Sequence, residues 1–121
     1  MLDAAPAIEK VRVLAHKPPT TSAPARKGML LSFPARAGHE AEMEQFLSEA
    51  LAMVEDEPGT LAWFAIQRDN GDYGIFDVFP DNGARFAHLT GHVPRALARN
   101  VNRLGGMPDL HLMEVVAEPR R

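Results

Sequence analysis

Cysteine is missing from this sequence of 121 residues, and it has neither a long apolar run nor an excess of basic charge. The absence of cysteine excludes disulfides, thiolate metal ligands and cysteine nucleophiles, and is compatible with a reducing cytosol. No run approaches the roughly 20 apolar residues that a membrane-spanning helix needs. The N-terminal segment carries Asp3 and Glu9 and has no apolar stretch typical of a signal peptide. We therefore expect a cytoplasmic protein.

Charge and composition are those of an ordinary globular domain. Apolar residues make up 45% of the chain and charged residues 24%, and its length fits one domain with its own core. A net charge of −3 gives no electrostatic reason to bind nucleic acid or an acidic membrane. The spacing of glycines, serines and histidines shows no phosphate-binding loop and no Ser-His-Asp arrangement.

The most informative segment is a predicted β-hairpin, in which residues 61–66 and 73–79 flank the turn-forming residues 68–72. Neither strand alternates between apolar and polar residues, so both faces are apolar. On the first strand Leu61, Trp63 and Ala65 oppose Ala62, Phe64 and Ile66, and on the second Ile75 and Phe79 oppose Phe76 and Val78. A strand that is apolar on both faces must be covered on both. Because the chain is small, we expect a second copy to supply one cover, which predicts a homodimer.

The other segments predict an α+β domain. Strands are expected at residues 8–15, 29–33 and 110–117, with a proline-rich linker at 17–24. A helix after Gly38 has an apolar stripe and ends at Pro58-Gly59. Without the first strand the order is β-α-β-β-α-β, the ferredoxin-like pattern with an antiparallel sheet. We therefore divide the chain into an N-terminal extension, residues 1–27, and a ferredoxin-like domain, residues 28–121.

The second helical region is expected to be broken. Asp81 or Asn82 is a plausible N-cap for a helix that carries Phe86 and Leu89 inward. Gly91 and Pro94 interrupt this helix, and the next one starts near Pro94 and ends at Gly105-Gly106.

The two terminal strand segments also resemble each other: residues 6–15 share a proline, a valine and an alanine with residues 108–117. One interpretation is that any two apolar strands look alike. The other is that the first strand repeats the last and occupies a comparable edge position in the sheet.

Short motifs in the second half resemble the antibiotic biosynthesis monooxygenase-like family. They are residues 58–61 (Pro-Gly-Thr-Leu), residues 74–81 (Gly-Ile-Phe-Asp-Val-Phe-Pro-Asp), Ala87-His88-Leu89 and His92. Asp77-Val78-Phe79 stands where that family carries an acid-x-aromatic triplet, commonly Glu-x-Trp. The resemblance covers residues 29–117 and implies a dimeric α+β barrel of ferredoxin-like subunits. Some members of the family oxidise polycyclic phenols to quinones with dioxygen and no cofactor, and others degrade haem.

The sequence departs from the haem-degrading branch of this family. That branch carries an Asn on its first strand, where residues 29–33 have none, and a haem-ligating His in the last helix, where Ala98 aligns. The resemblance therefore implies that haem is not bound, and we expect no cofactor.

Asp77 and His88 are the candidate catalytic residues. Asp77 is a carboxylate between Ile75 and Phe79 on one face of a strand, where an unpaired charge would cost several kcal/mol. A structural interpretation pairs it with His88, an arginine or backbone; a functional one makes it a general base that takes a phenolic proton. His88 either holds its helix against the sheet or acts as the acid–base partner of Asp77.

Five residues are candidates for substrate binding: Trp63, Tyr73, Phe79, Arg85 and His92. Trp63 is either core or interface, or a stacking wall for a flat ligand, and Tyr73 can donate a hydrogen bond from the rim. Phe79 shares a strand face with Asp77, while Arg85 and His92 share a helix face with His88. His88 and His92 also have the spacing of a two-histidine metal pair, but no third ligand is evident, so we expect no metal site.

These observations predict a cofactor-independent, monooxygenase-like oxidoreductase that acts on an aromatic or quinone-type small molecule. The alternatives are a non-catalytic dimer that binds a small hydrophobic metabolite, and a structural protein whose cavity is filled by its own side chains. An apolar pocket with Asp77 or His88 at its wall would favour catalysis, and a pocket without polar groups would favour binding alone.

Overall fold

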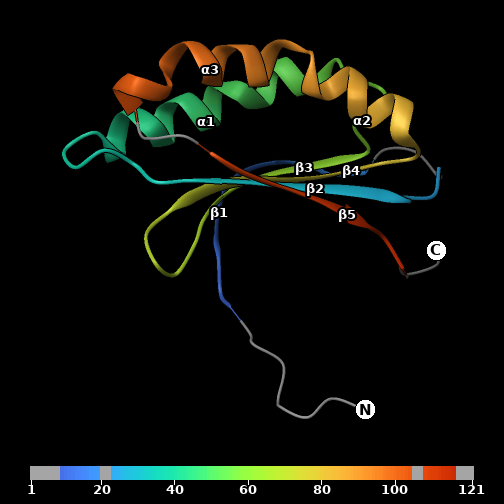
Figure 1. The fold of residues 1–121 in the computed structure, drawn as a ribbon, viewed down its shortest axis with the longest axis horizontal. Helices are drawn as coiled ribbons and strands as arrows, with labels where there is room; N and C mark the ends of the chain where they lie inside the picture. Colours follow the sequence, from blue (N-terminus) through green and yellow to red (C-terminus); the bar gives the residue numbers. More distant parts are fainter. Residues whose placement is uncertain (1–8, 20–22, 105–107, 117–121) are drawn as a thin grey trace.

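The computed structural model describes residues 9–19, 23–104 and 108–116. A five-stranded sheet forms one layer, and three helices lie across one of its faces (Figure 1). The elements are β1 (Arg12–Lys17), β2 (Lys27–Phe33), α1 (Glu40–Glu55), β3 (Ala62–Gln67), β4 (Tyr73–Phe79), α2 (Asn82–Leu89), α3 (His92–Leu104) and β5 (Asp109–Glu114). Within these ranges no helix has the length and hydrophobicity to cross a membrane.

All neighbouring strands are antiparallel, in the order β1-β3-β4-β2-β5. Without β1, the order along the chain is β-α-β-β-α-β, because α2 and α3 are two parts of one helical region broken at Thr90 and Gly91. The predicted α+β fold of the ferredoxin-like type is therefore confirmed. β1 extends that sheet beyond β3.

The N-terminal strand lies further along the chain than predicted. The sequence predicts residues 8–15, whereas β1 runs from Arg12 to Lys17, and Ile8 lies outside the described residues. Pairing with β3 extends as far as Lys17. The Lys17 ammonium is buried and donates hydrogen bonds to the carbonyl oxygens of Val54 (3.1 Å) and Glu57 (2.7 Å) at the end of α1. This tertiary contact, which alternation of apolar residues cannot reveal, extends the strand.

β1 and β5 occupy the two opposite edges of the sheet (Figure 1). β1 pairs only with β3, and β5 pairs only with β2, each in antiparallel orientation. Of the two segments that resemble each other in sequence, residues 12–15 lie in β1 and residues 109–114 form β5, so a part of each lies in an edge strand. The resemblance itself stays open to both interpretations, since edge strands share similar constraints.

Helix α1 forms as its apolar spacing predicts. Met43, Leu47, Ala50 and Val54 recur at intervals of three and four residues and are all buried against the sheet. Glu40 and Glu42 in the first turn favour the positive end of the helix dipole.

The hairpin is apolar on both faces, as predicted, but the two faces are covered unequally. Trp63 and Ile75 face the helices and are buried in the main core. On the opposite face Phe64 stacks on Phe76 across the two strands, with ring centroids 6.4 Å apart, and both rings are half-buried. No helix among the described residues lies over that second face (Figure 1).

The predicted hairpin turn and the predicted N-cap of α2 are both present, but one side chain of α2 points the other way from the prediction. Gly71 adopts a positive φ of 93° in the hairpin turn, a conformation that favours glycine. Asp81 caps α2 by accepting a hydrogen bond from the backbone N–H of Ala84. The prediction that Phe86 faces inward is wrong, because Phe86 is 68% exposed. Residues two apart on a helix face different sides, and it is His88 that takes the inward side.

Candidate functional site

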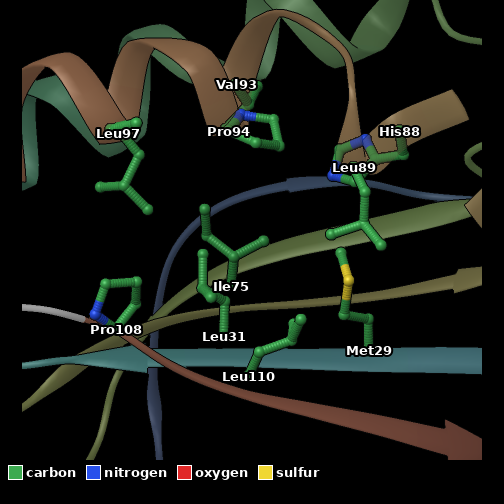
Figure 2. A pocket seen from close by; sticks show the side chains of 11 residues that line it. Met29, Leu31, Ile75, His88, Leu89, Val93, Pro94, Leu97, Pro108 and Leu110 are labelled. Atoms are coloured by element: carbon green, nitrogen blue, oxygen red, sulfur yellow. The ribbon is translucent and has the colours of Figure 1, made fainter. Parts of the chain in front are cut away.

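An apolar pocket of about 360 Å³ lies between the helices and the sheet (Figure 2). Side chains from α2 and α3 line it on one side and side chains from β2, β4 and β5 on the other. The lining residues are Met29, Leu31, Ile75, His88, Leu89, Val93, Pro94, Leu97, Ala98, Pro108 and Leu110. Among these described residues, His88 alone has a polar side chain, which makes it the candidate for proton transfer with a ligand in this pocket.

His88 and Asp77, the two predicted catalytic residues, are brought together by the fold. His88 faces inward near the end of α2, and Asp77 lies on the helix-facing side of β4. Nε2 of His88 is 2.9 Å from Oδ2 of Asp77, and both side chains are almost completely buried. The two atoms are at ion-pair distance, but they are not aligned as a hydrogen bond. Neither Asp77 oxygen has a hydrogen-bond partner among the described residues.

Glu57 is a third member of this cluster, and the sequence analysis missed it. Its Oε1 lies 2.7 Å from Nδ1 of His88 and accepts a hydrogen bond of 2.9 Å from the hydroxyl of Thr60. Glu57 is in the loop between α1 and β3, 31 residues before His88. No regular spacing links these positions, and only the acidic residue directly before the Pro58-Gly59 turn offered a signal.

Both titratable groups at the centre of the cluster are perturbed. Burial raises the pKa of the Asp77 carboxyl, a shift that the contact with His88 opposes and the charge of Glu57 reinforces. Burial acts to lower the pKa of His88, but its close contacts and charge interactions with Asp77 and Glu57 outweigh burial and raise it. Both shifts have the same meaning, since each shows the cluster holding a proton more tightly than the free side chains would.

The proton count of the cluster follows from the two contacts of the imidazole ring. A neutral imidazole donates from one nitrogen only, whereas each ring nitrogen of His88 faces a carboxyl group. Both contacts are favourable at once when His88 is an imidazolium ion or the Asp77 carboxyl is protonated. The cluster of Glu57, His88 and Asp77 therefore favours holding a proton next to the apolar pocket.

Trp63 lies in the core and is absent from the pocket lining. It is completely buried and stands directly opposite Asp77 in the pairing of β3 with β4. Its indole Nε1 has no hydrogen-bond partner among the described residues. This position matches the core interpretation of Trp63.

Tyr73, Phe79 and Arg85 are likewise not among the described residues that line the pocket. Tyr73 donates a hydrogen bond of 2.7 Å to Oε2 of Glu44, and burial together with that carboxylate raises the pKa of Tyr73 to about 12. Phe79 packs against the His88 ring, with centroids 5.4 Å apart. Arg85 donates to the backbone carbonyls of β2 and β5. The side chain of His92 falls outside the described residues.

The described residues that line the pocket do not fit haem. Ala98 lines the pocket from α3 and has no ligating atom, and both nitrogens of His88 face carboxyl groups. A group of three or more histidine and acidic side chains arranged to hold a metal ion does not occur among the described residues.

No model of a known protein family matches the chain, and no curated protein sequence matches it. Several solved structures are similar to it. A provisionally named monooxygenase from Fusobacterium nucleatum is 12% identical, with a TM-score of 0.64 over 88% of this chain and 48% of that one. A heme-degrading enzyme from Listeria monocytogenes is 11% identical, with a TM-score of 0.64 over 84% of this chain and 68% of that one. At these identities the similarity shows the fold alone.

A stronger similarity is to NE2512, a protein of unknown function from Nitrosomonas europaea. The two are 33% identical, with a TM-score of 0.76, and the match covers 80% of this chain and 95% of that protein. Because this identity extends over almost the whole of NE2512, the chain belongs to the same family as that Nitrosomonas europaea protein.

Proposed function

We propose that this protein is a monooxygenase-like oxidoreductase of the antibiotic biosynthesis monooxygenase type. It binds an aromatic or quinone-type small molecule in the apolar pocket and oxidises it with dioxygen, without a bound cofactor. The observation that carries the proposal is the position of His88, a proton-storing imidazole at the wall of an otherwise apolar pocket. The shared fold of the Fusobacterium and Listeria proteins is consistent with this class of chemistry.

The pocket is suited to a flat, apolar substrate with one polar group. Its aliphatic walls can bury most of the surface of such a molecule, and a hydroxyl group placed at His88 would be the only part of the ligand near a titratable side chain. A dry pocket also holds substrate and dioxygen together and keeps water from the oxidised intermediate.

The proposed reaction needs no external reductant. A polycyclic phenol loses its hydroxyl proton and one ring hydrogen, and its own electrons reduce dioxygen. One oxygen atom becomes the new carbonyl oxygen of the quinone, and the other leaves as water. To take the hydroxyl proton, His88 must first release one of the two carboxyl groups that face its ring nitrogens; it then returns the proton for the formation of water. Asp77 and Glu57, which do not line the pocket, set the proton affinity of His88.

We also propose that the protein is a homodimer. Phe64 and Phe76 on the open face of the sheet are half-buried within one chain, and Val13, which pairs with Ile66 on the neighbouring strand, is 50% exposed. A second sheet packed against this face would bury these side chains, each worth about 1.5 to 3 kcal/mol when fully buried.

The test is an oxygen-electrode screen of hydroxylated naphthalenes and anthracenes with the purified protein and no added cofactor. We expect oxygen uptake equal to the quinone formed, one molecule for each substrate. A His88→Gln variant should lose most of this activity while its circular dichroism spectrum stays unchanged. No oxygen uptake with any member of the panel would count against the enzyme.

The second candidate function is binding without catalysis, and one observation favours it. Both nitrogens of His88 already face carboxyl groups, which leaves mainly the ring face and its carbon atoms for a ligand. Tight binding of the same aromatic compounds without oxygen uptake would support this alternative. A purely structural role is disfavoured, because the described side chains leave the pocket open.

A further inference from the structure

The His88–Glu57 pair lies between two hollows of different character. On one side His88 lines the apolar pocket. On the other side Glu57 lines a depression of about 410 Å³ between α1 and α3, together with Met53, Asp56, Ala96 and Arg99. Charged side chains rim this depression, and the Glu57 side chain is 21% exposed to water. The 2.7 Å contact between Glu57 Oε1 and His88 Nδ1 therefore connects water to the wall of the dry pocket.

The loop that carries Glu57 is fixed in place from several directions. Lys17 donates a hydrogen bond of 2.7 Å to the backbone carbonyl of Glu57, and Thr60 donates one to its carboxylate. A side chain at Gly59 would come within 3.0 Å of the Cβ of Ala84 on α2, so the loop packs directly on that helix. These contacts hold both the backbone and the carboxylate of Glu57, so the Glu57 side chain is fixed in its position next to His88.

The Glu57 carboxylate lies against the break between α2 and α3. A Cβ atom at Gly91 would lie 3.4 Å from Oε2 of Glu57, an ordinary contact distance, and only 3.2 Å from the carbonyl oxygen of His88. Gly91 therefore permits the close backbone approach at the end of α2, and the carboxylate packs next to it.

The charged groups around His88 come from three elements and one loop. Asp77 faces it from β4 and Glu57 from the α1–β3 loop. Lys17 from β1 lies behind Glu57, on its backbone carbonyl, and Arg99 from α3 lies at the outer depression. Of these groups only Glu57 combines contact with His88 and exposure to water, since Asp77 is completely buried.

We propose that Glu57 is the outer end of a proton path that runs from the depression between α1 and α3 to His88 at the pocket wall. The path exchanges a proton between His88 and water without admitting water to the pocket. The role of this path in oxidation rests on the proposed function, because there the path would carry the phenolic proton from His88 to water. The connection itself is a property of the protein without ligand, and is tested without a substrate.

The test is nuclear magnetic resonance of the full chain with isotope-labelled histidine and no ligand. The His88 ring signals are assigned by their loss in His88→Gln. In Glu57→Gln the amide can still accept a hydrogen bond from Nδ1 but cannot carry a proton onward. We expect His88 in this variant to bind its proton about tenfold more weakly, because a neighbouring negative charge is lost. We also expect the exchange of its ring N–H with water to slow by about tenfold.

The direction of the exchange effect separates a proton path from simple electrostatics. If Glu57 acted only through its charge, the more weakly bound proton would exchange faster in Glu57→Gln. Asp56→Asn, at the rim of the same depression, is the matched control and should leave both His88 measurements unchanged. Exchange in Glu57→Gln that is as fast as in the unmodified protein, or faster, would overturn the proposal.

A shorter carboxylate gives a second measurement in case Glu57→Gln fails to fold. Glu57→Asp keeps the charge but withdraws it from Nδ1, so we expect exchange between the rates of the unmodified protein and of a blocked path. Unchanged exchange in a folded Glu57→Asp protein would equally reject the path. If Glu57→Gln loses oxidation activity but its His88 N–H exchanges as fast as in the unmodified protein, the proton path is rejected and the proposed enzyme is not. If exchange slows in Glu57→Gln but the unmodified protein oxidises no substrate, the proposed enzyme is rejected and the proton path is not.

Discussion

Trp63 and Asp77 stand directly opposite each other on β3 and β4, and each buries polar atoms that have no hydrogen-bond partner among the described residues. A buried donor or acceptor without a partner costs about 1 to 3 kcal/mol. These unpaired polar atoms lie in the part of the sheet beneath His88, beside the pocket wall. The imidazole of His88, 2.9 Å from Oδ2 of Asp77, offsets part of this cost through its charge, whereas the indole N–H of Trp63 has no such contact within the described part of the chain.

Replacement of Trp63 separates packing from ligand binding. Trp63→Phe removes the unpaired indole N–H and keeps most of the ring, so its stability should be close to that of the unmodified protein. Trp63→Ala should lose about 3 to 5 kcal/mol of unfolding free energy, because it leaves a large cavity in the core. Urea unfolding of both variants measures this. Aromatic ligands should bind Trp63→Phe with unchanged affinity, and a large loss of affinity would instead place Trp63 in the binding site.

The stability of the protein should fall as the pH rises above neutrality. The pKa of His88 is higher in the folded chain than its ordinary value of 6.5, so the folded state binds the proton more tightly. This stabilisation is complete below the ordinary value and is lost as the pH rises through the raised value. The raised pKa of Asp77 acts in the same direction from its ordinary 3.8 upward.

Thermal unfolding between about pH 6 and about pH 9 measures this dependence. The carboxylates with a lowered pKa, those of Glu9, Glu44 and Glu114, are ionised in both states throughout this window and add no slope. We expect the midpoint to fall across the window, and the fall to be smaller in His88→Gln. A midpoint that rises with pH would contradict the raised pKa values.

Filling the pocket should abolish ligand binding without loss of the fold. Ala98 lines the pocket from an exposed position on α3, so Ala98→Phe places a ring in a cavity of about 360 Å³. Binding of a fluorescent hydroxyanthracene should weaken by about tenfold or more, equal to about 1.4 kcal/mol. Ala52→Phe, on an exposed position of α1, adds the same ring elsewhere and should bind normally. Equal binding by both variants would place the ligand outside this pocket.

A charge on the open face of the sheet should dissociate the proposed dimer. Phe76 lies half-buried on that face, stacked against Phe64, so Phe76→Asp would bury a carboxylate in the dimer interface. Sedimentation should show twice the mass of one 13.3 kDa chain for the unmodified protein and a single chain for the variant. Phe86→Asp, on the exposed side of α2, is the control and should remain dimeric. A monomeric unmodified protein would contradict the assembly.

Lys17 should contribute more to stability than an ordinary surface lysine. Its buried ammonium donates to two backbone carbonyls at the end of α1, and hydrogen bonds from a charged group are worth about 1.5 to 3 kcal/mol. Lys17→Met keeps the aliphatic stem and should lose about that amount of unfolding free energy. Lys27→Met breaks the surface ion pair with Glu114 and should cost much less. Similar losses in the two variants would argue against this role for Lys17.

The sequence allowed the fold to be predicted well where local signals and packing agree. Helix α1 has an apolar stripe at helical spacing, the hairpin has two apolar runs around turn-forming residues, and Asp81 is a residue typical of an N-cap. The errors arose where a contact between distant segments decides the outcome. β1 lies further along the chain than predicted because Lys17 is buried under the end of α1. Phe86 is exposed, against the prediction, because His88 takes the inward side of α2.

The candidate site was only partly visible in the sequence. Asp77 and His88 could be paired, because a buried carboxylate on a strand needs a partner and the next helix offers an imidazole. Glu57 could not, since a loop residue far along the chain reaches His88 only after the α1–β3 loop has packed on α2. The pocket lining was equally hidden, because aliphatic residues from five elements have no common spacing.

The hydrogen bonds of Lys17 have a consequence for the evolution of this fold. They make the geometry around the imidazole depend on a strand that the four-stranded ferredoxin-like unit does not need for its own topology. A homologue that dispenses with this strand keeps the architecture but must anchor the acidic loop by other means. The N-terminal addition is therefore where the chemistry of related proteins can diverge while their backbones remain superimposable.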